Sequence, residues 1–200
     1  MDARTWPEPP LENPVPYLTY DADCALNAAR LAEGDGRAED EAAFSRIAVL
    51  LYFTALRALV NSLYEWSGVP DNEWRRLNVG HRWTAAVQLC LPHLEKPGEA
   101  LQFPRDHVGE DLPLLERFLE LRDAVNDMVH DDVPYRVVPV GADESTDAEV
   151  PTTYPRAGLP RRQSDYRREH AESAATIHDD MVARLDLCFR GKTRHLIETL

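Results

Sequence analysis

The chain has 200 residues, and its 22 Lys and Arg against 35 Asp and Glu give a formal net charge of −13. Hydrophobic residues make up 44% of the sequence and charged residues 28%, which is ordinary globular usage and excludes a mostly disordered chain. A chain of this length buries enough surface to be stable without disulfides or a structural metal, so we expect a single domain spanning residues 1–200.

The apolar and cysteine patterns predict a cytoplasmic protein with no membrane partner. The longest apolar stretch, residues 47–60, is shorter than the roughly 20 residues that cross a bilayer. The first residues lack the basic and apolar regions of a signal peptide. Cys24, Cys90 and Cys188 are widely spaced with no CxxC pair, and we interpret all three as packing residues.

The first half of the chain predicts an arm and two helices. Residues 1–20 contain five prolines, which indicate an extended arm. A short helix from about Asp21 to Leu31 follows, ended by glycines. The apolar repeat from Glu41 to Trp66 is typical of a long helix, and residues 47–60 are apolar on nearly every side. Such a helix is usually covered from two directions.

The second half predicts three more helical segments. Trp83–Leu91 forms a short helix that Pro92 ends, and residues 111–131 form a long one. Residues 133–163 are rich in proline and acid, so we expect an irregular insertion with at most a hairpin near residues 135–140. The C-terminal helix lies within residues 164–200. The predicted fold is an all-α, up-and-down bundle of four or five helices.

The long helix at 111–131 has three different faces at 3.6 residues per turn. The apolar face, which we expect in the core, carries Leu114, Phe118, Leu121, Val125 and Met128. The opposite face, which we expect in solvent, carries Glu116, Glu120, Asp123, Asp127 and Asp131.

A mixed face lies between these two, where Arg122, Asn126 and His130 recur every four residues. A guanidinium binds phosphate oxygens, an amide orients a ligand, and an imidazole moves a proton near neutral pH. This row therefore suits the binding of a phosphodiester. Asn126 and His130 could equally form hydrogen bonds with nearby polar groups of the protein itself.

Two segments together resemble the HEPN superfamily (higher eukaryotes and prokaryotes nucleotide-binding). Residues 47–61 read IAVLLYFTALRALVN, and residues 118–130 read FLELRDAVNDMVH. In that family a long apolar helix ending in Asn precedes a helix that carries Arg-Asn-x-x-x-His. The resemblance covers about residues 41–132 and implies an HEPN-like homodimer, with the Arg and His of both subunits in one cleft.

The resemblance implies a metal-independent endoribonuclease of the toxin or defence type, with no cofactor, in which His130 and Asn126 take part in catalysis. Val125 occupies the place of the family's arginine. Our hypothesis is that Arg57 or Arg122 supplies the missing charge. The alternative is a catalytically inactive dimer that binds RNA, a nucleotide or a protein partner such as an antitoxin or another defence component.

A basic cluster just before the last helix offers a second contact with RNA. Asp165 alone offsets its five arginines, which are Arg156, Arg161, Arg162, Arg167 and Arg168. The same cluster suits a solvated turn or a protein-docking site, and the salt dependence of binding separates these interpretations.

Two His-Asp pairs suggest a second enzyme class. His130-Asp131 and His178-Asp179 resemble the pairs of helical HD-type metal phosphohydrolases. His81 or His93 would then serve as an upstream ligand. We rank this interpretation below the other two.

Overall fold

The computed structural model describes residues 13–94, 112–129, 152–189 and 193, and in them the fold is an all-α helical bundle with one small hairpin. The predicted fold class is therefore confirmed at this level. In chain order the elements are α1 (Val15–Gly34), α2 (Ala38–Ser67), α3 (Asp71–Trp74), α4 (Val79–Leu94), α5 (Leu112–Val129), β1 (Thr153–Tyr154), β2 (Leu159–Pro160), the 3-10 turn η1 (Gln163–Asp165) and α6 (Arg168–Cys188).

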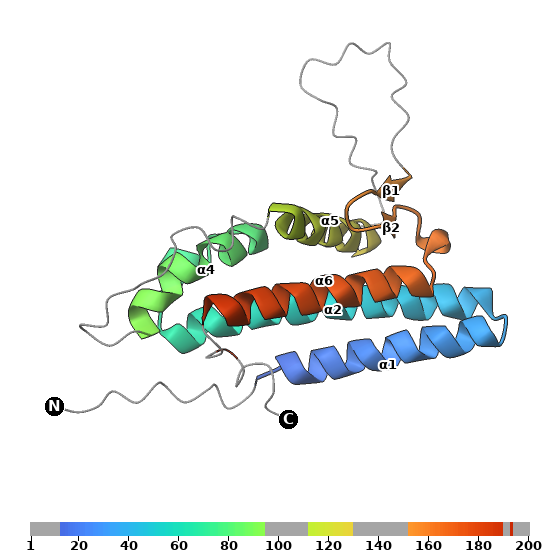
Figure 1. Ribbon diagram of the computed structural model, residues 1–200, viewed down its shortest axis with the longest axis horizontal. Helices are drawn as coiled ribbons and strands as arrows, with labels where there is room; N and C mark the ends of the chain where they lie inside the picture. The colour runs from blue at the N-terminus through green and yellow to red at the C-terminus, as the bar shows by residue number, and fades with distance from the viewer. Residues whose placement is uncertain (1–12, 95–111, 130–151, 190–192, 194–200) are drawn as a thin grey trace, which may run out of the picture.

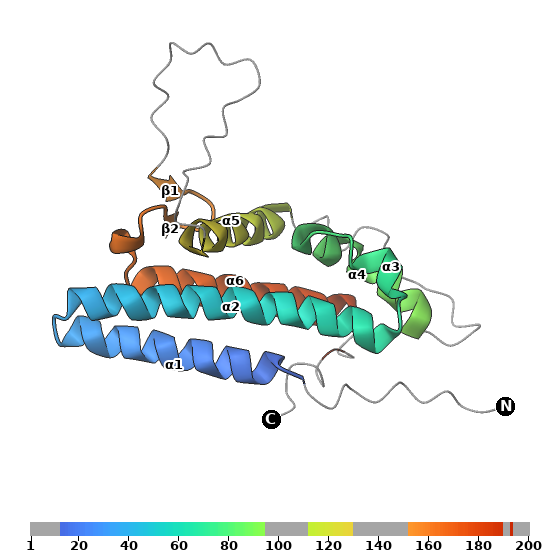
Figure 2. The ribbon, with the colours of Figure 1, turned by 180° about the vertical axis from the view of Figure 1, so that it is seen from behind.

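Helix α2 is the centre of the bundle. Figures 1 and 2 show α1 running along one side of α2, with α4 and α5 on the opposite side and α6 packed against a third side. Its length and apolarity would suffice to cross a membrane, but half of that apolar window is buried inside the protein. The predicted long helix with cover from more than one direction is confirmed, and packing accounts for the buried half of its apolar window.

Two helices differ from their predicted bounds because proline is tolerated near helix ends. Helix α1 begins at Val15, so the prediction that residues 15–20 are extended is wrong. Pro16 lies in the first turn, where its missing N–H is not needed, and the Asn13 carboxamide accepts a hydrogen bond from the Val15 N–H at 3.2 Å. Helix α4 likewise contains Pro92 in its last turn rather than ending before it. The rest of the predicted arm, residues 1–12, lies outside the described residues.

The apolar face of α5 packs into the core as predicted. Leu114, Phe118, Leu121 and Val125 are buried, and Met128 packs against them. Aromatic rings join three helices here, because the Phe118 ring of α5 lies 6.0 Å from Phe53 of α2 and 5.8 Å from Trp83 of α4. Core packing thus holds α5 and α4 against the central helix.

A hairpin covers Glu116, Glu120 and Asp127 on the acidic face of α5, so the prediction that this face lies in solvent is wrong for these three, whereas Asp123 stays partly exposed and pairs with Arg122. The Glu120 carboxylate accepts hydrogen bonds from the backbone N–H groups of Arg156 and Ala157 at 2.7 and 2.8 Å. Arg156 pairs with Glu116 at 3.2 Å, and Asp127 accepts a hydrogen bond from the Tyr154 hydroxyl. Donors that follow these carboxylates by 27 to 40 residues in the chain therefore satisfy them.

This hairpin lies in a segment predicted to be irregular. Strands β1 and β2 are antiparallel, with Thr153 opposite Pro160 and Tyr154 opposite Leu159. The turn between them needs Gly158, whose φ is +67°, a left-handed value that glycine adopts without strain. The hairpin predicted near residues 135–140 lies outside the described residues.

The cysteines do not all pack as predicted. Cys90 and Cys188 are buried, and burial raises the pKa of the Cys90 thiol to about 12. Cys24 is exposed on α1, so the prediction that it packs is wrong. A cysteine on a helix is buried only if its face meets another element, which spacing along the chain does not reveal.

Candidate functional site

The start of α4 is the point where α2, α4 and α5 meet and where polar side chains gather. Asn78 caps the helix, since its side-chain oxygen accepts a hydrogen bond from the His81 backbone N–H at 2.9 Å. The Asn78 amide nitrogen also lies 3.1 Å from His81 Nδ1. His81 itself is exposed, so its ring borders solvent beside the capped first turn.

Arg82 follows His81 and holds three segments together through neutral acceptors alone. Its guanidinium donates to the carbonyl oxygens of Leu77 and Arg75 at 2.9 and 3.1 Å and to Asn61 Oδ1 at 2.6 Å. The same group lies 5.0 Å from the ring centre of Trp74. No carboxylate of the described residues pairs with Arg82. Its positive charge is therefore positioned but not neutralised.

Arg57 lies on α2, one turn before Asn61, and is exposed. Arg82 donates to Asn61 one turn further along the same helix, which places both arginines at this part of α2. Burial lowers the pKa of the Arg82 guanidinium, and the positive charge of Arg57 lowers it further. Arg57 makes no hydrogen bond or ion pair within the described part of the chain. Neither of these two cations is therefore neutralised by a carboxylate of the described residues.

Arg122 reaches the same helix start from α5. A Cβ placed on Gly80 would lie 2.8 Å from Leu119 Cδ2 and 3.8 Å from an Arg122 guanidinium nitrogen. The absence of a side chain at Gly80 therefore lets α5 approach the first turn of α4 closely. Arg122 is half-buried and pairs with its neighbour Asp123 at 2.6 Å. We call Arg57 and Arg82 the arginine cluster, and Arg122 borders the same helix start at Gly80.

The residues predicted as catalytic are only partly described. Arg122 lies beside the first turn of α4, and Arg57 lies on α2 one turn before Asn61, to which Arg82 of α4 donates. Asn126 is exposed, one turn beyond Arg122 on α5. His130 follows the end of α5 and lies outside the described residues.

Sequence reasoning missed Arg82, and it treated His81 only as a possible metal ligand. A cap residue followed by His and Arg is a weak signal, because any surface helix can begin this way. What marks Arg82 is the set of acceptors around it, which come from α2, the segment after α3 and the residue before Asn78. That set exists only in the folded chain.

The five arginines of the predicted second RNA contact are largely paired within the chain. Arg161 lies over the Tyr154 ring at 4.3 Å and 3.6 Å from Asp127. Arg168 pairs with Glu33 and Glu172, Arg156 pairs with Glu116, and Arg167 donates to the carbonyl oxygens of Ser164 and Tyr166. Arg162 is exposed, with no ion pair among the described residues. Most of this positive charge therefore stabilises the fold.

The His-Asp pair of α6 is tied into the bundle. His178 is buried, its Nδ1 lies 3.0 Å from Asp179, and its Nε2 lies 3.4 Å from the Thr19 hydroxyl of α1. Both ring nitrogens thus have partners inside the protein. No group of three His, Cys, Asp or Glu side chains suited to a metal occurs in the ranges that the structure describes. The other pair, His130-Asp131, lies outside those ranges.

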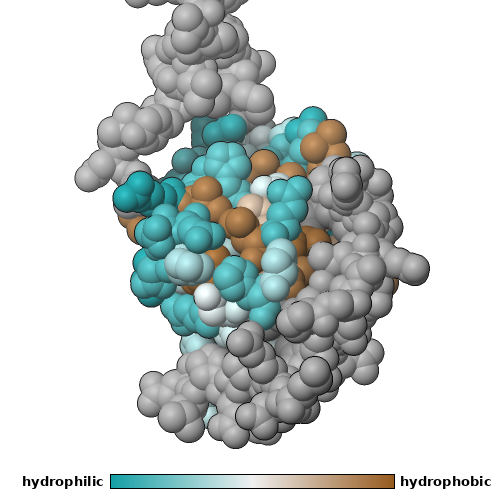
Figure 3. Space-filling view, turned by 90° about the vertical axis from the view of Figure 1, so that its left-hand side faces the viewer, coloured by the Kyte–Doolittle hydropathy of each residue, from teal (hydrophilic) through white to brown (hydrophobic). Residues whose placement is uncertain are grey.

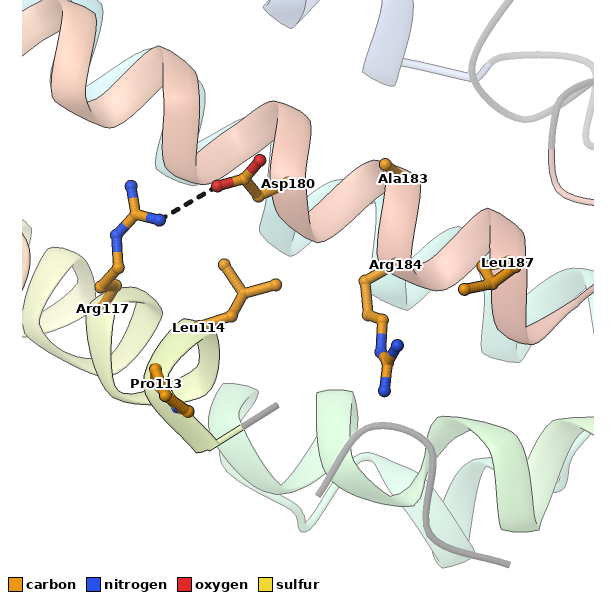
Figure 4. Close-up of a pocket in the computed structure, with 7 residues that line it drawn as sticks. All are labelled: Pro113, Leu114, Arg117, Asp180, Ala183, Arg184 and Leu187. Atoms are coloured by element: carbon orange, nitrogen blue, oxygen red, sulfur yellow. Dashed lines mark hydrogen bonds and ion pairs between the residues drawn. The ribbon is translucent and has the colours of Figure 1, made fainter. Parts of the chain in front are cut away.

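A separate pocket of about 430 Å³ lies between α5 and α6 and contains none of the predicted site residues (Figure 4). Its lining residues are Pro113, Leu114, Arg117, Asp180, Ala183, Arg184 and Leu187. Arg117 pairs with Asp180 across it at 3.0 Å. Figure 3 shows the end of the molecule that lies at the left of Figure 1, where hydrophobic residues form a patch among hydrophilic ones.

Comparisons with protein-family models, with curated proteins and with solved structures found no match. The resemblance carried by residues 47–61 and 118–130 therefore stays a prediction.

Proposed function

We propose that this protein is a cytoplasmic, HEPN-like homodimer that binds RNA through the arginine cluster. The observation that carries the proposal is that Arg82 is held at Asn61, one turn along α2 from exposed Arg57, and that neither arginine has a carboxylate partner among the described residues, in a chain of net charge −13. Neighbouring like charges oppose folding, so this arrangement is a cost that an anionic ligand would offset.

The chemistry of the cluster favours phosphate as that anion. A guanidinium forms paired hydrogen bonds with phosphate oxygens, and Arg82 is already fixed by three acceptors and the Trp74 ring. Arg57 is exposed and available, while Arg122 and the capped start of α4 border the same region. RNA presents phosphates in series together with 2′-hydroxyl groups that Asn and His side chains can bind.

The proposal is tested by titrating a labelled single-stranded RNA with the protein between about 50 and 200 mM salt. Arg57→Gln is expected to weaken binding about tenfold and to reduce the slope of log affinity against log salt by about 1, because one phosphate contact is lost. Arg122→Gln is expected to act in the same direction with a smaller effect, because Asp123 already shares its charge.

Arg162→Gln is the matched control, since it removes an exposed arginine distant in sequence from the cluster. The proposal requires RNA affinity to depend on Arg57 more than on Arg162. Salt-independent affinity, or a loss of binding with Arg162→Gln alone, would contradict it and would return the RNA contact to residues 156–168.

A metal-independent endoribonuclease is the second candidate function. The row Arg122, Asn126 and His130 favours it, since Arg122 borders the start of α4 and Asn126 is exposed one turn further on. We expect cleavage in the presence of a chelator, with cyclic phosphate ends, and a loss of about a hundredfold in rate with His130→Ala. Undiminished cleavage by His130→Ala excludes this mechanism. RNA binding without any cleavage by the unmodified protein supports the inactive binding module.

A further inference from the structure

The side chain of Asn78, just before α4, has an orientation that its hydrogen bonds determine. Its Oδ1 atom accepts the hydrogen bond from the His81 backbone N–H at 2.9 Å. A backbone N–H can only donate, so the amide atom that faces it is the oxygen and the other amide atom is the nitrogen. The cap of α4 therefore fixes which way the Asn78 carboxamide points.

This orientation in turn fixes the position of the proton on the His81 imidazole. Asn78 Nδ2 lies 3.1 Å from His81 Nδ1, and an amide nitrogen can only donate, so Nδ1 is the acceptor. A neutral imidazole carries its single proton on the other nitrogen, which makes Nε2 of His81 a donor. His81 is exposed, and its Nε2 has no hydrogen-bond partner among the described residues.

Arg122 brings a further donor to the same place from α5. Its Nε donates to Asp123 Oδ1 at 2.8 Å, and its Nη2 lies 2.6 Å from the same oxygen. The carboxylate thus occupies one edge of the guanidinium and leaves Nη1 unpaired within the described part of the chain. A Cβ placed on Gly80 would lie 3.8 Å from Arg122 Nη1 and 3.4 Å from Asn78 Oδ1, so the two side chains flank one point.

The polar groups left over at this point are donors. They are Nε2 of His81, the second N–H of Asn78 Nδ2 and Nη1 of Arg122, while the Asn78 oxygen is already occupied by the His81 N–H. Asn78 and His81 are exposed and Arg122 is half-buried, so a ligand from solvent can reach all three. A ligand with several acceptor oxygens and a negative charge matches such a set, and a phosphate group has both properties.

We propose that Asn78, His81 and Arg122 form a phosphate-binding site in which neutral His81 donates from Nε2. This inference rests on the proposed function where the phosphate belongs to RNA, and it adds a contact separate from those of Arg57 and Arg82. The phosphate of a mononucleotide presents the same oxygens, and the experiments below distinguish the two sources. His81 acts here as a binding residue, because an Nε2 that already carries a proton cannot accept one from a 2′-hydroxyl group.

The first test follows the His81 ring by nuclear magnetic resonance while adenosine 5′-monophosphate is added to the full chain. The His81 signals, assigned by their loss in His81→Leu, are expected to shift saturably with the nucleotide and to stay in place with adenosine, which lacks the phosphate. Equal shifts with both compounds overturn the inference. Long-range proton–nitrogen correlation in the free protein reads the tautomer, and a neutral His81 protonated on Nδ1 also overturns it.

Matched variants test whether the donor at Nε2 binds the phosphate. His81→Leu is expected to weaken nucleotide binding about tenfold, because a hydrogen bond to a charged ligand is lost. His81→Gln supplies an amide N–H instead and is expected to keep most of the affinity. Asn78→Ser retains a good helix cap but not the amide that orients the imidazole, so an intermediate loss is expected.

His93→Leu is the control for these variants, since it removes an exposed histidine from the last turn of the same helix. The inference requires nucleotide affinity to fall with His81→Leu and to stay unchanged with His93→Leu. Equal affinities of His81→Leu and the unmodified protein contradict the site.

Single-stranded RNA with and without a 5′-phosphate identifies the source of the phosphate. Shifts of the His81 signals with RNA that lacks the end phosphate assign the site to an internal phosphodiester, whereas shifts only with 5′-phosphorylated RNA and the mononucleotide assign it to a terminal phosphate. RNA binding that depends on Arg57 but not on His81 contradicts this inference alone. Nucleotide binding at His81 in a chain that does not bind RNA contradicts the RNA proposal alone.

Discussion

Phe118→Ala is expected to lower the free energy of unfolding by about 3–5 kcal/mol. The Phe118 side chain is fully buried, and its ring contacts the aromatic rings of Phe53 in α2 and Trp83 in α4. Truncation removes both ring contacts and leaves a cavity where three helices meet, which the rigid backbone closes only in part. Urea denaturation followed by circular dichroism measures the loss.

Two variants make that measurement specific. Phe118→Leu keeps much of the volume and is expected to cost less than half as much. Leu112→Ala, at a first-turn position of α5 that is 55% exposed, is expected to stay within about 0.5 kcal/mol of the unmodified protein. Equal losses for Phe118→Ala and Leu112→Ala would show that α5 does not pack into the core.

Arg82→Ala is expected to cost about 2–4 kcal/mol of stability, because hydrogen bonds to a charged donor contribute about 1.5–3 kcal/mol each before solvent screening. Its guanidinium joins Asn61 of α2 to the backbone of Leu77 and Arg75, so truncation leaves acceptors unpaired. Thermal unfolding followed by circular dichroism measures the effect.

Arg82→Lys keeps the charge but not the three-way geometry, so we expect it to recover only part of that stability. Arg76→Ala, at an exposed position without an ion pair among the described residues, is the control and is expected to be near neutral. Recovery of full stability by Arg82→Lys would mean that charge alone matters. This structural role is why the RNA titration uses Arg57 and Arg122 instead.

The basic and acidic clusters show how the fold redistributes charge. The sequence places five acids on one face of the 111–131 helix and five arginines near the last helix. Each set by itself carries a large net charge of one sign. In the structure the hairpin brings Arg156 to Glu116 and Arg161 to Asp127. The arginines predicted to contact RNA are thereby mostly neutralised, whereas Arg57 keeps its charge free among the described residues.

The helices that periodicity predicted best are those with a complete apolar face. The ends of α2 and α5 are close to the predicted ones. In both helices the hydrophobic residues that recur at helical spacing are the residues that the core buries. The predicted start of α1 and end of α4 are wrong, because a proline near a helix end costs little and does not break the helix there. The hairpin was missed because two residues per strand leave too short a pattern to recognise.

For the candidate site, the sequence identified Arg57 and Arg122 as relevant but not Arg82, whose role depends on acceptors from several segments. The HEPN resemblance and the role of His130 stay predictions.

The helical fold class, the central apolar helix and the inward face of α5 can all be predicted from local patterns, since each depends on the repeat of hydrophobic residues along the chain. Which charges are paired, which arginines lie close together and which side chains of α1 stay exposed is known only from the folded chain. These properties depend on distances between residues far apart along the chain, and such distances are set by packing rather than by any local pattern.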